Sequence, residues 1–262
     1  MNWHRVFAIV LKIQYMFRRD VFRIFDIFWW PAFSLFIWGL FSIYMQKMSG
    51  GSVNIISILL GGVILWTFFD RASKDISLAI IDELWNKNFV NLFTSPLTIT
   101  EYLLAVIIMA MGKLLLSAIF MFFLASTFYA FHVSSVGWFL VPAALGLTLT
   151  GWTVSLVVQS SIMRWGHTVE VFIWAVATLV QPFSCVFYPI TALPGWAQYI
   201  ARVLPPMYLF ENMRAAMTGQ GVNIGEIILS FGLNIGYFIL ALVFFYRSFR
   251  FAKKEGLLIK NY

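Results

Sequence analysis

Long apolar runs separated by short polar connections are the main pattern along the chain. A bilayer has an apolar core of ~30 Å, which a helix of ~20 residues crosses. Six runs are about that long or longer, so the pattern predicts an all-α membrane protein with six transmembrane helices. We expect residues 1–262 to form one transmembrane domain. The predicted helices cover residues 27–46, 54–80, 102–131, 136–159, 169–188 and 224–246.

The first 26 residues mix apolar and basic positions with a helical period. The pattern predicts an interfacial helix over residues 1–26 that lies on the inner membrane surface. Its basic side would be offered to anionic lipid headgroups or to a protein partner, although simple anchoring of the topology explains the same pattern. The basic residues are Arg5, Lys12, Arg19 and Arg23, and the apolar side carries Val6, Val10, Ile13, Phe17 and Ile24.

A second amphipathic pattern lies between the second and third apolar runs and predicts a short cytoplasmic helix over residues 82–95. Pro96 ends this helix, and Thr98 and Glu101 have the spacing of a capping box that begins the next helix. The short helix either transmits movement from a soluble partner or seals the connection. Its apolar side carries Trp85, Phe89, Leu92 and Phe93, and its polar side carries Glu83, Lys87 and Thr94.

The segment between the last two apolar runs is rich in proline and too interrupted to cross a membrane. Two short helices are predicted, over residues 196–204 and 207–218, and each is near half a membrane in length. Because both ends of the segment lie on one side, we expect residues 189–219 to form a re-entrant hairpin. Glu211 and Arg214 are three residues apart and are predicted to pair on one helix face.

Composition and charge exclude several classes of protein. The chain is 61% apolar and 11% charged, which excludes an ordinary soluble domain. Its net charge of +7 comes from basic residues beside the apolar runs, so we do not expect nucleic-acid binding. No metal site is predicted, because the single Cys185 and the histidines lie far apart in the sequence. The histidines are His4, His132 and His167.

The distribution of Lys and Arg predicts the orientation in the membrane. Fourteen of these residues fall on one side of the predicted spans and three, Lys47, Arg202 and Arg214, on the other. By the positive-inside rule both termini are expected to be cytoplasmic, and the proline-rich hairpin is expected outside the cell membrane. The fourteen are Arg5, Lys12, Arg18, Arg19, Arg23, Arg71, Lys74, Lys87, Arg164, Arg247, Arg250, Lys253, Lys254 and Lys260.

Over essentially its whole length the chain resembles the permeases of ABC-2 type exporters. The resemblance rests on the amphipathic first helix, the six spans, the motif SPL at residues 95–97, and YPITALPGW followed by PPMYLFENMR before the last span. It implies that two permease copies pair in the membrane as a homodimer above two ATP-binding subunits. The resemblance also implies that the complex moves its substrate out of the cell.

The resemblance also implies roles for the two short helical segments. Residues 82–95 would be a coupling helix seated in a groove of the ATPase, and residues 189–219 would be gate helices at the outer mouth. The implied coupling residues are Asp82, Glu83, Trp85, Lys87, Phe89 and Leu92. The implied gate residues are Pro189, Pro194, Trp196, Pro205, Pro206, Tyr208, Glu211 and Arg214.

The chain is not expected to be an enzyme. Its Gly112-Lys113 pair lacks the upstream glycine and the following Ser or Thr of a phosphate-binding loop. We therefore expect no cofactor in this chain, with ATP and Mg bound by a partner ATPase. A secondary, ion-coupled transporter is the alternative class, but it would show broken helices near the middle of the membrane and several buried carboxylates.

The expected substrate is amphipathic or lipid-linked, because the spans that such permeases place near the dimer axis carry mostly aromatic side chains. A small hydrophobic drug is the alternative cargo. Lys113, inside the third span, either holds an anionic headgroup, reaches the surface, or pairs with a carboxylate such as Glu170. Packing against lipid or other helices is the alternative explanation of these aromatic residues. The expected path residues are Trp66, Phe69, Lys113, Gln181, Phe183 and Phe187.

Overall fold

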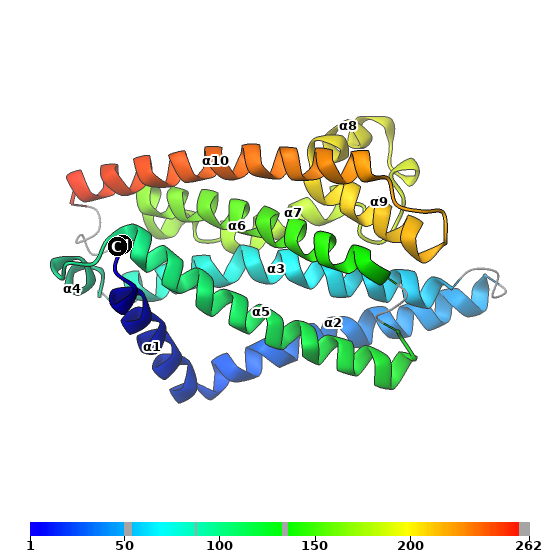
Figure 1. The fold of residues 1–262 in the computed structure, drawn as a ribbon, viewed down its shortest axis with the longest axis horizontal. Helices are drawn as coiled ribbons and strands as arrows, with labels where there is room; N and C mark the ends of the chain where they lie inside the picture. Colours follow the sequence, from blue (N-terminus) through cyan, green and yellow to red (C-terminus); the bar gives the residue numbers. More distant parts are fainter. Residues whose placement is uncertain (50–53, 87, 133–135, 257–262) are drawn as a thin grey trace.

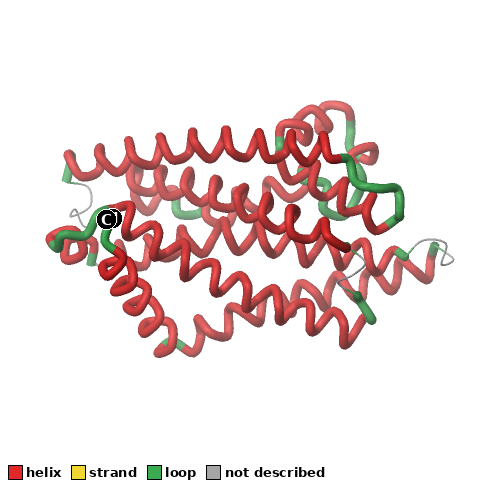
Figure 2. Tube along the Cα trace, viewed as in Figure 1, coloured by secondary structure: helices red, strands yellow, loops and turns green. Residues whose placement is uncertain are grey.

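The chain folds into a bundle of long helices. The computed structural model describes residues 1–49, 54–86, 88–132 and 136–256, and every regular element within them is helical (Figure 2). Five of these helices are long and apolar enough to cross a membrane. They are α2 (Val21–Met48), α3 (Ile55–Trp85), α5 (Ile99–Tyr129), α6 (Leu140–Trp165) and α10 (Ile224–Lys254).

The remaining helices are shorter and lie mostly at the two ends of the bundle (Figure 1). The longer of them are α1 (Trp3–Arg19), α4 (Phe89–Thr94), α7 (Phe172–Phe183), α8 (Gly195–Val203) and α9 (Pro205–Met217). Within the described residues, 3-10 turns cover Gly137–Phe139, Gly166–Val169 and Ile190–Ala192.

The sixth full-length span, expected over residues 169–188, is not confirmed. The helix there, α7, has 12 residues, which is ~18 Å of helix against an apolar core of ~30 Å. Pro182 lies in its last turn, and Cys185 has a φ of 56°, outside the right-handed helical region. Helix α6 ends near one end of the bundle and α8 begins at the other (Figure 1). The chain between them therefore crosses the bundle partly as α7 and partly without α-helix.

The two ends of the bundle carry different segments. Helices α1 and α4 and the C-terminal end of α10 lie at one end, and α8 and α9 lie at the other (Figure 1). We call these the inner end and the outer end, after the orientation expected from the basic residues. Of the long helices, α2 and α5 run from the inner end to the outer end, whereas α3, α6 and α10 run in the opposite direction (Figure 1).

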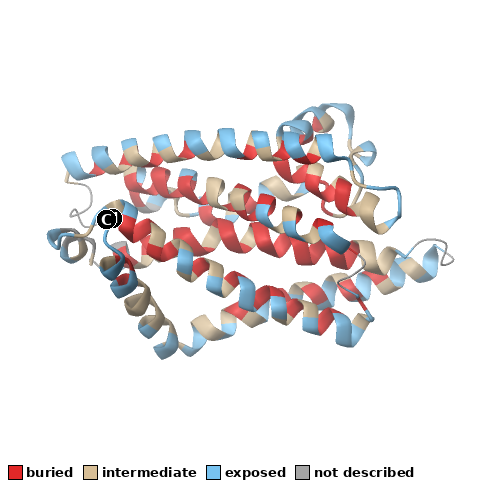
Figure 3. Cartoon of the chain, in the orientation of Figure 1, coloured by how far each residue is buried: buried red, intermediate tan, exposed pale blue. Residues whose placement is uncertain are grey.

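Helix α3 is the centre of the bundle. In its apolar window 67% of the residues are buried, against 22% in α2 and in α10, and Figure 3 shows the continuous buried stripe of α3. It crosses α6 closely at Gly151, where an added Cβ would lie 2.6 Å from the carbonyl oxygen of Phe69. The hydroxyls of Ser77 and Ser155 share a hydrogen bond of 2.8 Å across the same contact. Small and hydroxyl residues at such crossings are typical of membrane helices.

Helices α2 and α10 turn much of their apolar surface outward. Trp30 and Leu40 of α2 are 59% and 66% exposed, and Ile228 and Leu240 of α10 are each 67% exposed. Exposed apolar side chains along a whole helix would be unfavourable in water but suit contact with lipid tails. The helix lengths and this outward surface together identify a multi-pass membrane protein.

Candidate functional site

The first structural feature of the inner end is the junction between α1 and α2. Asp20 lies between them, and its carboxylate accepts hydrogen bonds from the backbone N–H groups of Phe22 and Arg23. Desolvation raises the pKa of Asp20, but these bonds and that from the Arg23 side chain outweigh it and hold the pKa below its usual value. The predicted helix over residues 1–26 is therefore divided, because the cap at Asp20 begins a new helix.

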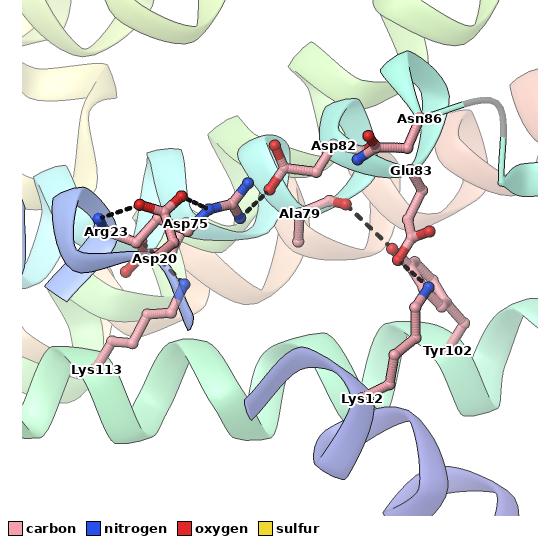
Figure 4. Close-up of polar contacts among 10 residues, drawn as sticks. All are labelled: Lys12, Asp20, Arg23, Asp75, Ala79, Asp82, Glu83, Asn86, Tyr102 and Lys113. Atoms are coloured by element: carbon pink, nitrogen blue, oxygen red, sulfur yellow. Dashed lines mark hydrogen bonds and ion pairs between the residues drawn. The ribbon is translucent and has the colours of Figure 1, made fainter. Parts of the chain in front are cut away.

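Helix α1 packs against the bundle with both its apolar and its basic residues. Val6 and Ile9 are buried in a cluster with Tyr102 of α5. Lys12 Nζ lies 2.6 Å from Glu83 Oε1, and Arg23, at the start of α2, forms an ion pair with Asp82 (Figure 4).

Arg5 extends the same arrangement toward α5. Its guanidinium lies 3.8 Å from Glu101 Oε2 and donates a hydrogen bond to the carbonyl of Pro96. The expectation that the basic side of α1 faces headgroups or another protein is therefore wrong for Arg5, Lys12 and Arg23. Their charges are taken up by carboxylates of the same chain, which stand where the ends of α3 and α5 meet α1.

Glu83 and Glu101 accept further hydrogen bonds in addition to their ion pairs. Glu83 is 4% exposed and also accepts a hydrogen bond of 2.8 Å from the side-chain amide of Asn88. Glu101 completes the predicted capping box with Thr98 and accepts a hydrogen bond of 2.7 Å from the backbone N–H of Asn2. We call the three pairs Arg5–Glu101, Lys12–Glu83 and Arg23–Asp82 the inner ion-pair cluster. It fastens both ends of the α3–α5 connection to α1 and to the start of α2.

The connection itself differs from the single helix predicted over residues 82–95. Asp82 to Trp85 form the last turn of α3, and the separate helix α4 begins at Phe89 and has six residues. Helix α3 continues this far because Asp82 and Glu83 are neutralised by α1 and α2. Leu92 is partly buried against the cluster around Tyr102, whereas Trp85 is 52% exposed. Lys87 lies outside the described residues.

A second set of charges lies deeper between the helices. Arg71 of α3 lies 2.8 Å from Asp26 of α2, and Asp75 Oδ1 lies 4.0 Å from both Arg71 and Lys113. Lys113 therefore faces Asp75 across the α3–α5 contact, and not Glu170. Asp26 and Asp75 were absent from the predicted site residues, although an acidic residue at the edge of an apolar run is itself a signal of function.

At the outer end the predicted pair is confirmed. Arg214 and Glu211 lie 2.8 Å apart on α9. Glu211 Oε1 also accepts a hydrogen bond of 2.6 Å from the backbone N–H of Ile190, and Arg214 donates one of 2.7 Å to the carbonyl of Cys185. The pair thus holds the irregular stretch after α7 against α9. The two side chains provide hydrogen-bond partners for the Ile190 N–H and the Cys185 carbonyl, which have none within a helix.

The prolines of the hairpin mark the beginnings of its helical segments. Pro189 precedes the turn Ile190–Ala192, Pro194 precedes α8, and Pro205 and Pro206 are the first residues of α9. Proline suits these positions because its missing N–H has no helical partner there. Helix α9 is largely buried among the long helices, with Tyr208 donating a hydrogen bond to the carbonyl of Arg202. Helix α8 is more open, and Trp196 is 64% exposed.

The residues expected along a substrate path do not gather in one place. Trp66 and Phe69 are buried in the main core, where their rings pack against each other with centroids 4.6 Å apart. Phe187 stacks on Trp38 of α2, Phe183 contacts Trp196, and Gln181 is partly buried. Lys113 belongs to the deeper charges between α3 and α5. Within one chain these side chains serve packing more than they line a common surface.

Comparison with known proteins adds one assignment. A family model described as ABC-2 type transporter matches residues 8–218, which include the inner ion-pair cluster apart from Arg5 and all but the last residue of the outer hairpin. No curated protein matches the chain. Among the described residues, no group of three or more His, Cys, Asp or Glu side chains is arranged to hold a metal ion.

Proposed function

Because the chain belongs to the ABC-2 type transporter family, we propose that it is the permease of an ATP-driven exporter. In this proposal it moves an amphipathic or lipid-linked substrate out of the cytoplasm or the inner leaflet. Permeases of the family are membrane-spanning transport components that work with ABC ATPase subunits, and they are not themselves catalytic. Two identical copies and two ATPase subunits would make up the complex, and each copy would supply half of the path.

The inner ion-pair cluster carries this proposal. A push applied to α4 reaches α1, α2, α3 and α5 together, because Glu83 and Glu101 at the two ends of the connection are bound to Lys12 and Arg5. The side chains of Glu83 and Glu101 are 5% and 2% exposed, so removing their cations would leave buried charges unpaired, and the connected elements are expected to move as a unit. Asp82 and Glu83 then act as internal fasteners. The ATPase would be contacted by the exposed residues of the connection, above all Trp85.

The outer hairpin is proposed to close the shared path while the inner side is open. Helix α9 is buried among the long helices, and the pair Glu211–Arg214 connects it to the irregular stretch that follows α7. Movement of the fifth passage would therefore reach the hairpin directly. An export path between two copies requires such a seal on its outer side.

The test compares two exposed tryptophans at opposite ends of the bundle. Trp85 is 52% exposed at the α3–α4 connection, and Trp138, the matched control, is 65% exposed beyond the outer end of α5. Replacing a central interface tryptophan costs about 2 kcal/mol or more, which is a factor of more than about ten in binding. We expect Trp85→Ala to lower permease-dependent ATP hydrolysis about tenfold in the complex reconstituted with its ATPase, while Trp138→Ala leaves it unchanged. Equal hydrolysis by both variants and the unmodified chain would contradict the coupling role.

A further inference from the structure

A cavity of about 270 Å³ lies at the inner end between α1, α2, α3 and α5. Arg23, Asp82 and Glu83 of the inner ion-pair cluster line part of it, but the proposed function assigns it no ligand. Part of its lining is apolar and comes from α1, α2 and α3, whereas α5 contributes Lys113. Phe22, one of these lining residues, is 86% exposed, so the cavity opens at the junction of α1 and α2. The apolar lining residues are Ile13, Met16, Phe17, Phe22, Ile27 and Leu78.

The acidic residues of the lining differ in how well they are paired. Asp26, Asp82 and Glu83 each have a cation within 2.8 Å. Asp75 does not, since its nearest cations, Arg71 and Lys113, both lie 4.0 Å from Oδ1. Its other oxygen, Oδ2, is buried and accepts no hydrogen bond from the residues that the structure describes.

Lys113, on the opposite wall, has no carboxylate closer than 4.0 Å among the described residues, and its side chain is 21% exposed. Its ammonium group is too far from Asp75 for a hydrogen bond and lies 5.3 Å from the centre of the Phe17 ring. A buried carboxylate oxygen without a donor is costly, and so is an ammonium group without an acceptor. The two side chains, which point toward each other in Figure 4, therefore favour a ligand that carries both a donor cation and an acceptor anion.

We propose that this cavity binds the headgroup of a phospholipid with a primary ammonium group, such as phosphatidylethanolamine. The ammonium donates hydrogen bonds to Asp75, the phosphate accepts them from Lys113, and the apolar lining contacts the glycerol and the first acyl carbons. A lipid is the source because the opening at Phe22 faces the surroundings of a membrane protein. A choline headgroup has the same charges but no N–H donor, so it leaves Asp75 unsatisfied. The proposal requires a membrane-embedded chain and is independent of ATPase coupling.

The experiment measures lipid binding to the detergent-purified, delipidated chain by native mass spectrometry. Phosphatidylethanolamine and phosphatidylcholine with identical acyl chains are the probes. A hydrogen bond to a charged group contributes enough for a preference of about tenfold for the ethanolamine lipid. In Asp75→Asn we expect the ratio to fall close to one. The matched control is Asp70→Asn, one turn away on α3, whose carboxylate pairs with Lys74 and does not line the cavity. It should keep the tenfold preference.

Two further variants test the site independently of Asp75. Lys113→Met removes the phosphate contact and should weaken both lipids alike, whereas Leu78→Trp fills the cavity and should reduce binding of both. Thermal unfolding of each variant checks that it is folded. Equal binding of the two lipids by the unmodified chain, or a preference that survives Asp75→Asn, overturns the proposal. It is also overturned if Leu78→Trp binds both lipids normally, or if soluble glycerophosphoethanolamine competes as well as the lipid.

Discussion

The inner and outer ends of the bundle both hold charged residues in a largely apolar protein, but they pair them differently. At the inner end Lys12–Glu83 and Arg23–Asp82 join residues 71 and 59 positions apart. At the outer end Glu211 and Arg214 are three residues apart on one helix. The inner pairs connect separate helices, whereas the outer pair is complete within α9 and acts outward only through backbone groups.

This difference suits the two proposed tasks. Ion pairs between helices make α1, α2, α3 and α5 respond together to a force applied at α4. A pair within α9 keeps its own charges neutral and joins α9 to the irregular stretch after α7 through two hydrogen bonds to backbone groups, which are easier to exchange when a gate opens. We expect the cost of breaking a pair to decrease from Lys12–Glu83, which joins two helices and has the most buried carboxylate of the three, through Glu211–Arg214 to the more exposed Asp70–Lys74.

The largest effect is expected for Lys12→Met at the inner end. The change leaves the Glu83 carboxylate, whose side chain is 5% exposed, without its cation. Breaking a buried pair in this way destabilises by about 3 kcal/mol, measured as thermal unfolding in detergent. The double variant Lys12→Met with Glu83→Gln removes the unpaired charge and should recover most of the loss. If the double variant is as unstable as the single one, the pair does not act as a fastener.

A smaller effect is expected for Glu211→Ala at the outer end. The change removes the acceptor of the Ile190 N–H and the partner of Arg214, but the two side chains are 25% and 13% exposed, so water compensates in part. We expect a loss of about 2 kcal/mol in the same unfolding measurement. Glu211→Gln is the control, because it keeps an acceptor for Ile190 and should lose about half as much. Equal losses would assign the effect to charge alone and remove the role of the backbone contact.

The smallest effect is expected for Asp70→Ala. Asp70 and Lys74 are four residues apart on α3, 2.6 Å apart and 31% and 21% exposed, and such pairs contribute about 0.5 kcal/mol or less. Asp26→Ala is the informative partner variant, because Asp26 joins α2 to Arg71 of α3 and Arg71 is 9% exposed. Asp26→Ala should unfold at a clearly lower temperature than Asp70→Ala. The opposite order would show that pairing between helices is no stronger here than pairing along one helix.

Features that depend on neighbouring residues could be predicted well from the sequence. The capping box of Thr98 and Glu101 begins α5 as expected, because both partners lie within one turn. The prolines begin the helical segments of the hairpin, and Glu211 pairs with Arg214, for the same local reason. Five of the six long apolar runs form helices long and apolar enough to cross a bilayer, as their length and composition predict, whereas the sixth forms a helix of 12 residues with Pro182 in its last turn.

Features that depend on distant residues were decided only by the tertiary structure. The basic side of α1 carries the same pattern whether it meets lipid headgroups or carboxylates, and only the approach of α3 and α5 selects Glu83 and Glu101 as its partners. Lys113 likewise faces Asp75 because two long helices cross there, and not because of any spacing along the chain. Periodicity identifies which residues share a face of a helix, but the free energy of burying a charge depends on what the opposite face supplies.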